Sequence, residues 1–561
     1  MAEDVKVPEG WRKIPLLEKL AFIKGKAPRK FYNFKEKNTI RYLTPECLRG
    51  RNNETLYCNI YEAEIVNDDV VVLWDGSNAG EIFFAKDGAI ASTMAKIEID
   101  EKSHKRFFYY YLKLYEPILK YQIKGSGIPH VEKDIFGLLP NTFPSFSEQR
   151  KIAEILETID NAIEKTDRII EKYKRIKQGL MQDLFIKGIT AFGFEKDKLI
   201  NAVKKAFKNG DHNFGREENL INHLSDYLRE VFSEWDVDSE IEKNKERHRP
   251  DIIIHKRRNL NENLFAIEVK KSEDLNRIKE DIKKLEDLML KEYRYEDAVF
   301  IGFNIENFDG IFELSEKVNF ILISKDGEVK IRNRVRRFKD SPLGRIPEEW
   351  DIFILGDVCT DIQDGTHYSP QTSDDGNFMY ITSKNIKFGH LDLSYVGYIS
   401  KKEHEKIYNR CRVKHGDILL TKDGVNTGNA AINIIKEPFS LLSSVAYLRP
   451  NKKIILREFL LQFILSYQGQ KIIKDSMKGL AITRITLEII KYIPVKVPPL
   501  PEQHRIASIL SQIDEAIEKE QKYKEKLERI KKGLMEDLLM GKVRGNHLIG
   551  ENKSLERVEN V

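Results

Sequence analysis

The chain has 561 residues, of which 94 are Lys or Arg and 89 are Asp or Glu, so its formal net charge is only +5 although 33% of it is charged. This length is enough for about three or four domains with sizeable cores. The small excess of positive charge permits a nucleic-acid partner without requiring one. No apolar run approaches the roughly 20 residues that a membrane span needs, and the acidic start Met1–Asp4 is not typical of a signal peptide.

The four cysteines also bear on the compartment. They form no CxxC pair and have no spacing typical of a metal site; they are Cys47, Cys58, Cys359 and Cys411. Widely spaced cysteines of this kind are expected to be reduced core thiols. We therefore expect a cytoplasmic protein.

The most informative feature is a segment that the chain contains twice. Residues 148–184 and 502–538 align without a gap at a constant offset of 354, and 22 of the 37 aligned positions are identical. Both copies have apolar residues at heptad spacing, which predicts two long helices. At about 1.5 Å per residue each helix is roughly 55 Å long.

The heptad pattern also predicts how the two helices meet. Ile152 and Ile159 in the first copy, and Ile506 and Ile513 in the second, fall at heptad position a. The d positions are also mostly apolar: Ile155, Ala162, Ile169 and Ile176, then Ile509, Ala516, Tyr523 and Ile530. We therefore expect an antiparallel coiled-coil pair that acts as a spacer, rather than two unrelated surface helices.

The segments that precede the two helices are duplicated as well. A Pro-Glu-x-Trp sequence opens both, ending at Trp11 and at Trp350, and the turn Asp75–Gly80 corresponds to Asp423–Gly428. The predicted order is therefore globule, helix, globule, helix. The expected bounds are 1–143 for the first globule, 144–188 for the first helix, 338–497 for the second globule, 498–545 for the second helix and 546–561 for a polar tail.

Residues 189–337 interrupt this symmetry, because no counterpart follows the second helix. A stretch of about 150 residues is enough for one domain. We call it the insert and expect a separate α/β domain there.

The insert contains a candidate catalytic site. Asp251 leads into the apolar run Ile252–Ile254, and a polar turn separates this run from Leu264–Lys270, which predicts a β-hairpin. Glu268 and Lys270 are two residues apart on a strand, so both point to one face, which Asp251 can reach. Two carboxylates and a lysine can hold Mg²⁺ and activate water against a phosphodiester.

Over the insert alone, this arrangement resembles the PD-(D/E)xK nuclease family. The resemblance implies that Asp251 and Glu268 are metal ligands, that Lys270 is catalytic, and that Glu218 on a preceding helix is a further acid. The alternative is a decayed copy that serves as a docking module, with these charges forming a solvated face.

The two globules carry no catalytic motif. The chain has no GxxxxGK[ST] loop and no methyl-donor motif, so we expect no cofactor there. Their loops are instead rich in side chains that contact bases and phosphates, although each loop taken singly can also be a solvated turn. The candidate DNA-binding residues are Arg29, Lys30, Asn33, Arg49, Arg51, Asn52, Gln363, Thr366, His367 and Tyr368.

Outside the insert, the chain resembles the specificity subunit of type I restriction-modification enzymes. The residues that carry the resemblance are the turn Asp364–His367, the strand motif Gly416–Thr421 and the Pro-x-x-Glu-Gln opening at Pro499–Gln503. The first globule departs from the pattern, because Lys24–Pro28 replaces the Asp-Gly-Thr-His turn. The resemblance implies two target recognition domains held apart by antiparallel helices, each reading half of a bipartite double-stranded DNA site. It also implies that methyltransferase subunits dock on the helices and that a motor-nuclease subunit joins them.

The expected fold class is therefore α/β (α+β), with two similar recognition domains, two long helices and an inserted nuclease-like domain. We expect a sequence-reading subunit that is not itself catalytic, with Mg²⁺ only in the insert. Two alternatives stay open. One is a self-contained Mg²⁺-dependent endonuclease that uses the insert, and the other is a scaffold that joins partners without reading DNA.

Overall fold

The computed structural model describes residues 7–50, 55–121, 129–209, 217–239, 250–255, 263–271, 274–286, 295, 297–477 and 484–544. The chain forms two compact units. One unit joins Met1–Lys172 to Ile517–Val561, and the other is Tyr173–Ala516. Each unit contains one of the two globules. No helix in the described ranges is long and apolar enough to cross a bilayer.

A seven-stranded sheet with the order β2-β8-β6-β7-β4-β5-β3 forms the first globule. The apolar residues of Val70–Leu73 are buried in strand β6, and helix α2 covers one face with buried aromatic side chains such as Phe107 and Tyr111. The bounds are β1 Arg12–Lys13, β2 Leu20–Lys24, β3 Phe31–Tyr32, β4 Thr39–Leu43, α1 Pro45–Leu48, β5 Tyr57–Asn59, β6 Glu64–Leu73, β7 Ile82–Ile90, β8 Met94–Ile99, α2 Lys105–Tyr121 and β9 Thr142–Phe143.

The second globule contains a four-stranded sheet, β19-β25-β22-β23, and a three-stranded sheet, β21-β20-β24. Helices α10 and α11 bury apolar side chains in the same core as the four-stranded sheet. The bounds are β16 Phe338–Lys339, β17 Ile346–Pro347, β18 Asp351–Ile354, α8 Leu355–Val358, β19 Cys359–Asp364, β20 Phe378–Ile381, β21 Gly397–Ile399, α9 Lys401–Arg410, β22 Ile418–Thr421, β23 Ala430–Ile432, β24 Ser440–Leu441, β25 Val445–Pro450, α10 Arg457–Leu465, α11 Tyr467–Asp475, α12 Leu487–Lys491 and β26 Pro494–Val497.

The duplication extends to the pairing of the strands. The order β2-β8-β6-β7 in one globule corresponds to β19-β25-β22-β23 in the other. Each globule also has one short parallel pairing at an equivalent place, which involves Tyr42–Leu43 of β4 and Tyr380–Ile381 of β20. The predicted similarity of the two globules therefore holds at the level of strand order and register.

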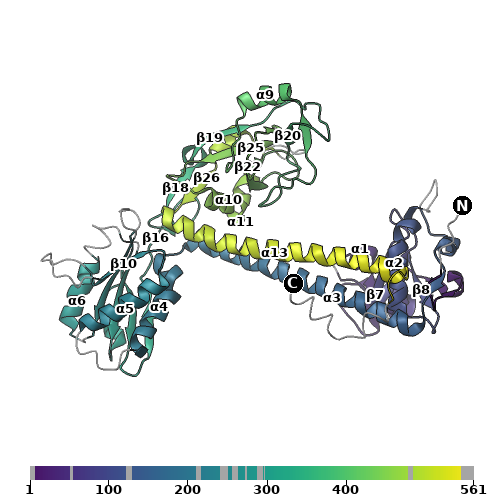
Figure 1. Cartoon of the computed structure of the whole chain (residues 1–561), viewed down its shortest axis with the longest axis horizontal. Helices are drawn as coiled ribbons and strands as arrows, with labels where there is room; N and C mark the ends of the chain where they lie inside the picture. The colour runs from purple at the N-terminus through teal and green to yellow at the C-terminus, as the bar shows by residue number, and fades with distance from the viewer. Residues whose placement is uncertain are drawn as a thin grey trace. The chain divides into compact units, whose positions relative to one another are not determined.

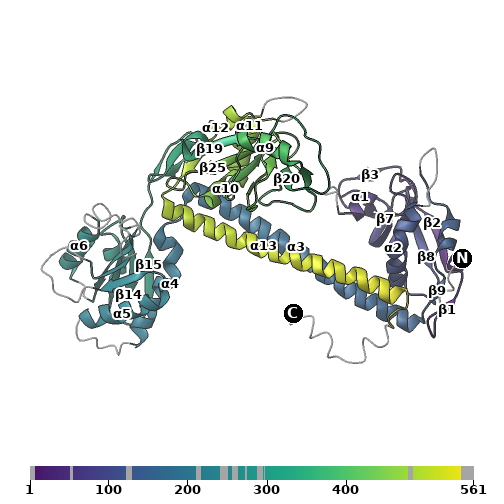
Figure 2. The ribbon, with the colours of Figure 1, turned by 45° about the horizontal axis from the view of Figure 1, so that its top comes forward.

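Figures 1 and 2 show the two long helices side by side; they are α3 Phe146–Lys187 and α13 Leu500–Leu539. Crossed ion pairs give their direction. In the first unit Lys531 Nζ lies 2.6 Å from Asp160 Oδ1, and in the second Lys177 Nζ lies 2.6 Å from Asp514 Oδ1. Because these lysines and aspartates are equivalent in the repeat, each copy pairs with the opposite end of the other. The helices are antiparallel, as predicted.

The buried face of the helix pair differs from the predicted a/d seam. Ile152 and Ile506 at a positions are fully buried, and Ile159 and Ile513 are partly buried. At the d positions, however, Ile176, Tyr523 and Ile530 are exposed. Position e is buried instead, for example at Leu156, Leu510 and Leu538, which pack into the globule cores. The predicted seam was wrong here because it left out the e positions, and two of these, Lys177 and Lys531, pair across the helices.

The insert contains a mixed six-stranded sheet with the order β10-β11-β12-β13-β14-β15. Helices α4 and α5 cover one face of it, and α6 and α7 cover the other. Its bounds are α4 Ala191–Asn209, α5 Glu217–Val231, β10 Asp236–Ser239, β11 Ile252–His255, β12 Asn263–Lys270, α6 Leu275–Lys284, β13 Asp297–Phe303, α7 Phe308–Phe312, β14 Asn319–Ile323 and β15 Val329–Arg332. The predicted hairpin is present as the antiparallel pair of β11 and β12, and its turn, residues 256–262, lies outside the described ranges.

A buried glutamate near the start of each long helix accepts hydrogen bonds from an arginine that is distant in the sequence. Glu502 accepts hydrogen bonds from Trp350 Nε1 at 2.9 Å, Ile189 N at 2.7 Å and both terminal nitrogens of Arg336 at 2.7 Å. The equivalent Glu148 accepts from Nε and Nη2 of Arg544 at 2.9 and 3.0 Å. Arg336 lies at the C-terminal end of the insert, whereas Arg544 follows shortly after the second helix.

Candidate nucleic-acid interface and insert site

In the second globule, the turn after β19 is built on a buried ion pair. Asp364 is buried and lies 3.4 Å from Lys422 Nζ and 3.2 Å from Arg410 Nη2. Gly365 follows it, and a Cβ at that position would collide with the backbone carbonyl of Leu441. Asp364 and Gly365 therefore hold the start of the turn against the sheet.

The next three residues of this turn were predicted to bind DNA. Thr366 is buried, and its backbone N–H donates to the Leu441 carbonyl. His367 and Tyr368 are exposed. His367 Nε2 lies 3.2 Å from Arg410 Nη2, and Tyr368 Oη donates to Glu403 at 2.7 Å, which raises the pKa of Tyr368.

Helix α9 therefore extends the polar surface that begins with this turn. Its last residue, Arg410, is exposed beside His367. We define the interface patch as His367, Tyr368 and Arg410. Sequence analysis missed Arg410, whose role depends on a contact between residues 43 positions apart. Gln363 lies on β19 and is only partly exposed.

The first globule builds the equivalent turn with a base where the second globule has an acid. Gly25 corresponds to Gly365, since a Cβ on it would collide with the Ala91 carbonyl oxygen. Lys24 takes the place of Asp364, and its Nζ pairs with Asp75 Oδ2 at 2.8 Å. The departure from the Asp-Gly-Thr-His pattern is therefore a charge reversal that keeps an ion pair at the turn.

The other candidates of the first globule lie in different surroundings. Arg29, Lys30 and Asn33 are exposed. The backbone N–H of Arg29 donates to Glu62, and Lys30 Nζ lies 4.7 Å from the centre of the Tyr32 ring. The candidates Arg51 and Asn52 lie outside the described ranges.

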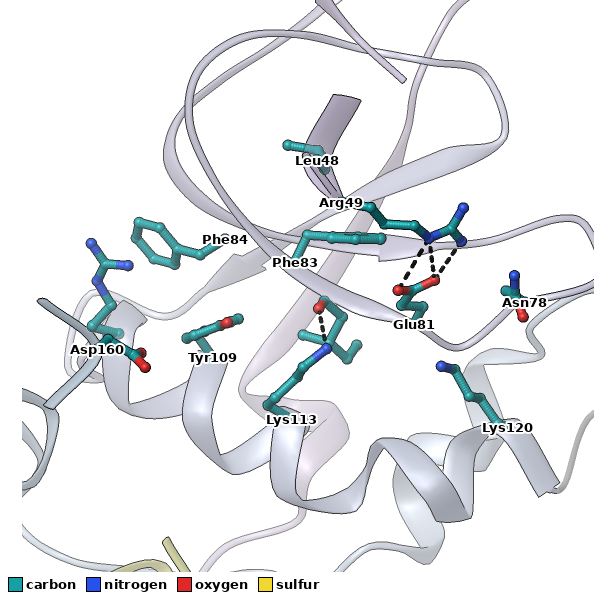
Figure 3. Close-up of a pocket in the computed structure, with 12 residues that line it drawn as sticks. Leu48, Arg49, Asn78, Glu81, Phe83, Phe84, Tyr109, Lys113, Lys120 and Asp160 are labelled. Atoms are coloured by element: carbon teal, nitrogen blue, oxygen red, sulfur yellow. Dashed lines mark hydrogen bonds and ion pairs between the residues drawn. The ribbon is translucent and has the colours of Figure 1, made fainter. Parts of the chain in front are cut away.

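Arg49 is placed differently from the prediction. Its guanidinium makes a two-pronged contact with Glu81, whose carboxylate accepts from Arg49 Nε at 3.1 Å (Figure 3). These two residues line a pocket of about 590 Å³. Its other cations also face carboxylates: Arg106 pairs with Glu157, and Lys113 and Lys120 both pair with Glu116. The pocket is thus balanced in charge, and Arg49 ties the end of α1 to the sheet instead of facing solvent.

The insert brings the predicted carboxylates together. Asp251 Oδ2 accepts a hydrogen bond from the backbone N–H of Val269 at 2.8 Å, so it reaches the β12 strand that carries Glu268. Glu268 is only 3% exposed. Burial raises the pKa of both carboxyls, that of Glu268 well above its ordinary value, with the charge of Asp251 adding to the effect on Glu268.

Lys270 and the helix α5 complete the insert site. Lys270 Nζ lies 2.9 Å from Asp281 Oδ2 and 3.4 Å from Glu217 Oε1. Burial lowers the pKa of Lys270, but Asp281 and Glu217 more than offset this, and the pKa is raised overall. Glu218, the predicted further acid, is exposed. The acid that α5 directs toward the lysine is therefore its neighbour Glu217, because a step of one residue turns a side chain by about 100° around a helix.

The donor set of the insert fits a hard divalent cation in part. Among the described residues no group of three or more His, Cys, Asp or Glu side chains could hold a metal ion. Mg²⁺, however, is often bound through one or two carboxylates together with phosphate oxygens of a substrate. The buried pair Asp251 and Glu268 supplies such carboxylates.

Sequence comparisons identify the class of protein. The sequence model of the type I restriction modification DNA specificity domain matches residues 8–174 and 347–529. The chain therefore belongs to this family: it is the DNA specificity subunit of a type I restriction-modification system and has two target recognition domains.

The chain is also similar to individual specificity subunits and to one solved structure. The MjaVIII specificity subunit of Methanocaldococcus jannaschii is 26% identical over 551 residues, which cover 97% of this chain and 95% of the relative. The EcoBI specificity subunit of Escherichia coli is 30% identical over 172 residues, 30% of this chain and 35% of that one. A crystal structure of the S subunit from M. genitalium covers 96% of this chain and 97% of its own length, with 12% identity and a TM-score of 0.46.

The matched ranges leave residues 175–346 outside the family model, and these include the whole insert. The comparisons provide no support for an inserted nuclease domain. The nuclease-like interpretation therefore stays a prediction that rests on the residues of the insert.

Proposed function

We propose that each recognition domain reads one half of a bipartite DNA target and that the helix pair sets the distance between the halves. The observation that carries this proposal is the repetition of one strand order in both globules, each attached to one end of an antiparallel helix pair. The crossed pairs of Lys177 with Asp514 and Lys531 with Asp160 support a spacer of defined register.

The interface patch is the proposed reading surface of the second domain. His367 and Arg410 carry donors that can reach base edges or phosphates, and Tyr368 adds a hydroxyl. Each mismatched base pair typically costs about 1–3 kcal/mol in such interfaces. Replacing His367 and Tyr368 by Ala should therefore relax recognition of one half-site about tenfold or more and leave the other half unchanged.

Methylation of a target library by the reconstituted complex tests this proposal. Tyr467→Ala is the matched control, because Tyr467 is an exposed tyrosine on α11 of the same globule. If the double variant loses selectivity for both halves together, the two domains do not read independently. If it keeps full selectivity for both, the patch does not read DNA.

We further propose that methyltransferase subunits dock on the helix pair. Ile176 of α3 and Ile530 of α13 are equivalent in the repeat, and they are 41% and 39% exposed. Two equivalent apolar positions suit two copies of one partner. Ile176→Glu and Ile530→Glu should each weaken the binding of a methyltransferase subunit in a pull-down with purified components, whereas the exposed Lys172→Glu should not. Equal binding by all three variants would contradict docking at this face.

A second candidate function, a Mg²⁺-dependent endonuclease in the insert, rests on the convergence of Asp251, Glu268 and Lys270. A bound Mg²⁺ would be held by Asp251 and Glu268 and would stabilise negative charge on a phosphodiester. Lys270 is held by Asp281 and Glu217 on the same face of the sheet. From there its ammonium can orient a water molecule and stabilise developing charge.

Cleavage of plasmid DNA by the purified full-length chain with Mg²⁺ tests the endonuclease. Asp251→Ala and Glu268→Ala should abolish cleavage, whereas Glu218→Ala, an exposed acid on α5, should keep it. Methylation by the complex should survive all three changes, because the insert lies outside both matched recognition regions. If the parent chain does not cut, or if the two site variants cut like the parent, the insert is not a nuclease.

A further inference from the structure

Helix α6 places a second lysine on the acidic pair of the insert. Lys284, the last residue of α6, has its Nζ 2.6 Å from Glu268 Oε1. One turn earlier on the same helix, Asp281 Oδ2 lies 2.9 Å from Lys270 Nζ. Two ion pairs therefore join α6 to β12. Lys284 of the helix pairs with Glu268 of the strand, and Asp281 of the helix pairs with Lys270 of the strand.

These contacts come from an anchored element. Ile278 and Ile282 of α6 are buried under the sheet together with Leu285, which follows the helix. Asp274 caps the helix by accepting hydrogen bonds from two backbone N–H groups of the first turn. The position of Lys284 beside Glu268 is therefore set by the packing of the helix.

Lys270 and Lys284 neutralise different carboxylates of the insert site. Two carboxyls that share a buried site need a cation nearby if they are to remain ionised. Lys270 faces Asp281 and Glu217, whereas Lys284 is the cation that contacts Glu268 directly. Lys284 thus already occupies Oε1 of the Glu268 carboxylate.

We propose that Lys284 is the counter-ion of the Asp251–Glu268 pair in the metal-free protein, and that a divalent cation binds by displacing its ammonium from Glu268. This inference rests on the metal site of the proposed endonuclease. It assigns Lys284 as the cation that occupies Glu268 when no metal is bound, and it makes the affinity for metal a competition with a tethered lysine.

Binding of Mn²⁺ alone to the full-length chain, measured by electron paramagnetic resonance, tests the displacement. Lys284→Met should bind Mn²⁺ at least about tenfold more tightly than the parent, because the competing cation is gone. The neighbouring exposed Lys283→Met is the matched control and should bind like the parent. Glu268→Gln should bind far more weakly in either background.

The possible failures are distinguishable. If Glu268→Gln removes binding but Lys284→Met binds like the parent or more weakly, the metal site stands and the displacement is overturned. If neither the parent nor Lys284→Met binds Mn²⁺, both the displacement and the proposed metal site are overturned. Binding by Lys284→Met but not by the parent supports the inference most strongly.

A measurement without metal tests the counter-ion separately. In EDTA, Lys284→Met should lower the melting temperature, because two buried carboxyls lose their cation. Adding Glu268→Gln to that variant should recover most of the loss, since the second change removes one of the two acids. Additive losses in the double mutant would show that Lys284 and Glu268 are not coupled and would overturn the inference.

Discussion

The two recognition domains share a strand order but solve the same local problem with opposite charges. In the second, the acid Asp364 is buried against Lys422, and in the first, the base Lys24 pairs with Asp75 at the turn's surface. Both turns keep a glycine, Gly365 or Gly25, packed against a backbone carbonyl. The comparison shows that close backbone packing constrains this turn more tightly than the sign of the charge, as long as the turn keeps an ion pair.

The junctions with the long helices also differ, but in the number of hydrogen bonds to a buried acid rather than in the sign of the charge. Glu502 gathers donors from Arg336, Trp350 and the chain at Ile189, whereas Glu148 is paired with Arg544. The second junction therefore has more hydrogen bonds to one buried charge. Each substitution below changes a residue in one recognition domain or helix junction. The equivalent residue in the other domain or junction serves as its reference.

The largest effect is expected at the helix junctions. Glu502→Gln should lower the free energy of unfolding by about 3–5 kcal/mol, because it leaves the guanidinium of Arg336 without its buried carboxylate. Glu148→Gln should cost less, because Arg544 lies closer to solvent. Urea denaturation of the two variants beside the parent checks the order, and equal losses would contradict the comparison.

The second effect is a pH dependence of stability that is expected in the second globule and not in the first. Lys496 is buried on β26 and donates to the Phe185 carbonyl, and burial lowers its pKa from 10.5 to about 8. The repeat places Thr142 at the equivalent position of the first globule. Between pH 8 and 10.5 the unfolded chain binds a proton that the folded chain has released, so stability rises with pH in this window, by at most about 3 kcal/mol.

Denaturation of the parent and of Lys496→Met from pH 7.5 to 10.5 isolates this contribution. The difference in stability between the two proteins should shift in favour of the parent as pH rises. Thr142→Val, on the other side, should leave the pH dependence unchanged. A constant difference across the range would show that Lys496 titrates normally in the folded chain.

A smaller effect is expected at the two recognition turns. Asp364→Asn should cost about 1–3 kcal/mol, because Lys422 is left buried with Asp423 as its remaining acid. Lys24→Ala should cost less than about 1 kcal/mol, because the Lys24 side chain is exposed. Thermal melting of both variants checks this. A larger loss of stability for Lys24→Ala would show that the exposed ion pair contributes more to stability than the buried one.

Much of the architecture was predictable from local pattern. The repeat at offset 354, the two long helices and the hairpin before Lys270 all follow from periodicity, which acts through residues a few positions apart. The resemblance of the turn Asp364–His367 to the specificity family was also readable, and the match to the family model confirms it. These features need no knowledge of which distant segments meet.

The partners of individual side chains were decided by the tertiary structure. Arg49 meets Glu81 across 32 positions, and Arg410 reaches His367 across 43. The choice of Glu217 over Glu218 depends on the rotation of α5 against the sheet. A charged side chain pairs with whatever acid or base the packed backbone brings within about 4 Å, and that approach is set by the burial of apolar faces far along the chain. The sequence by itself therefore determined the elements and their repetition, whereas packing decided which charges face solvent and which face one another.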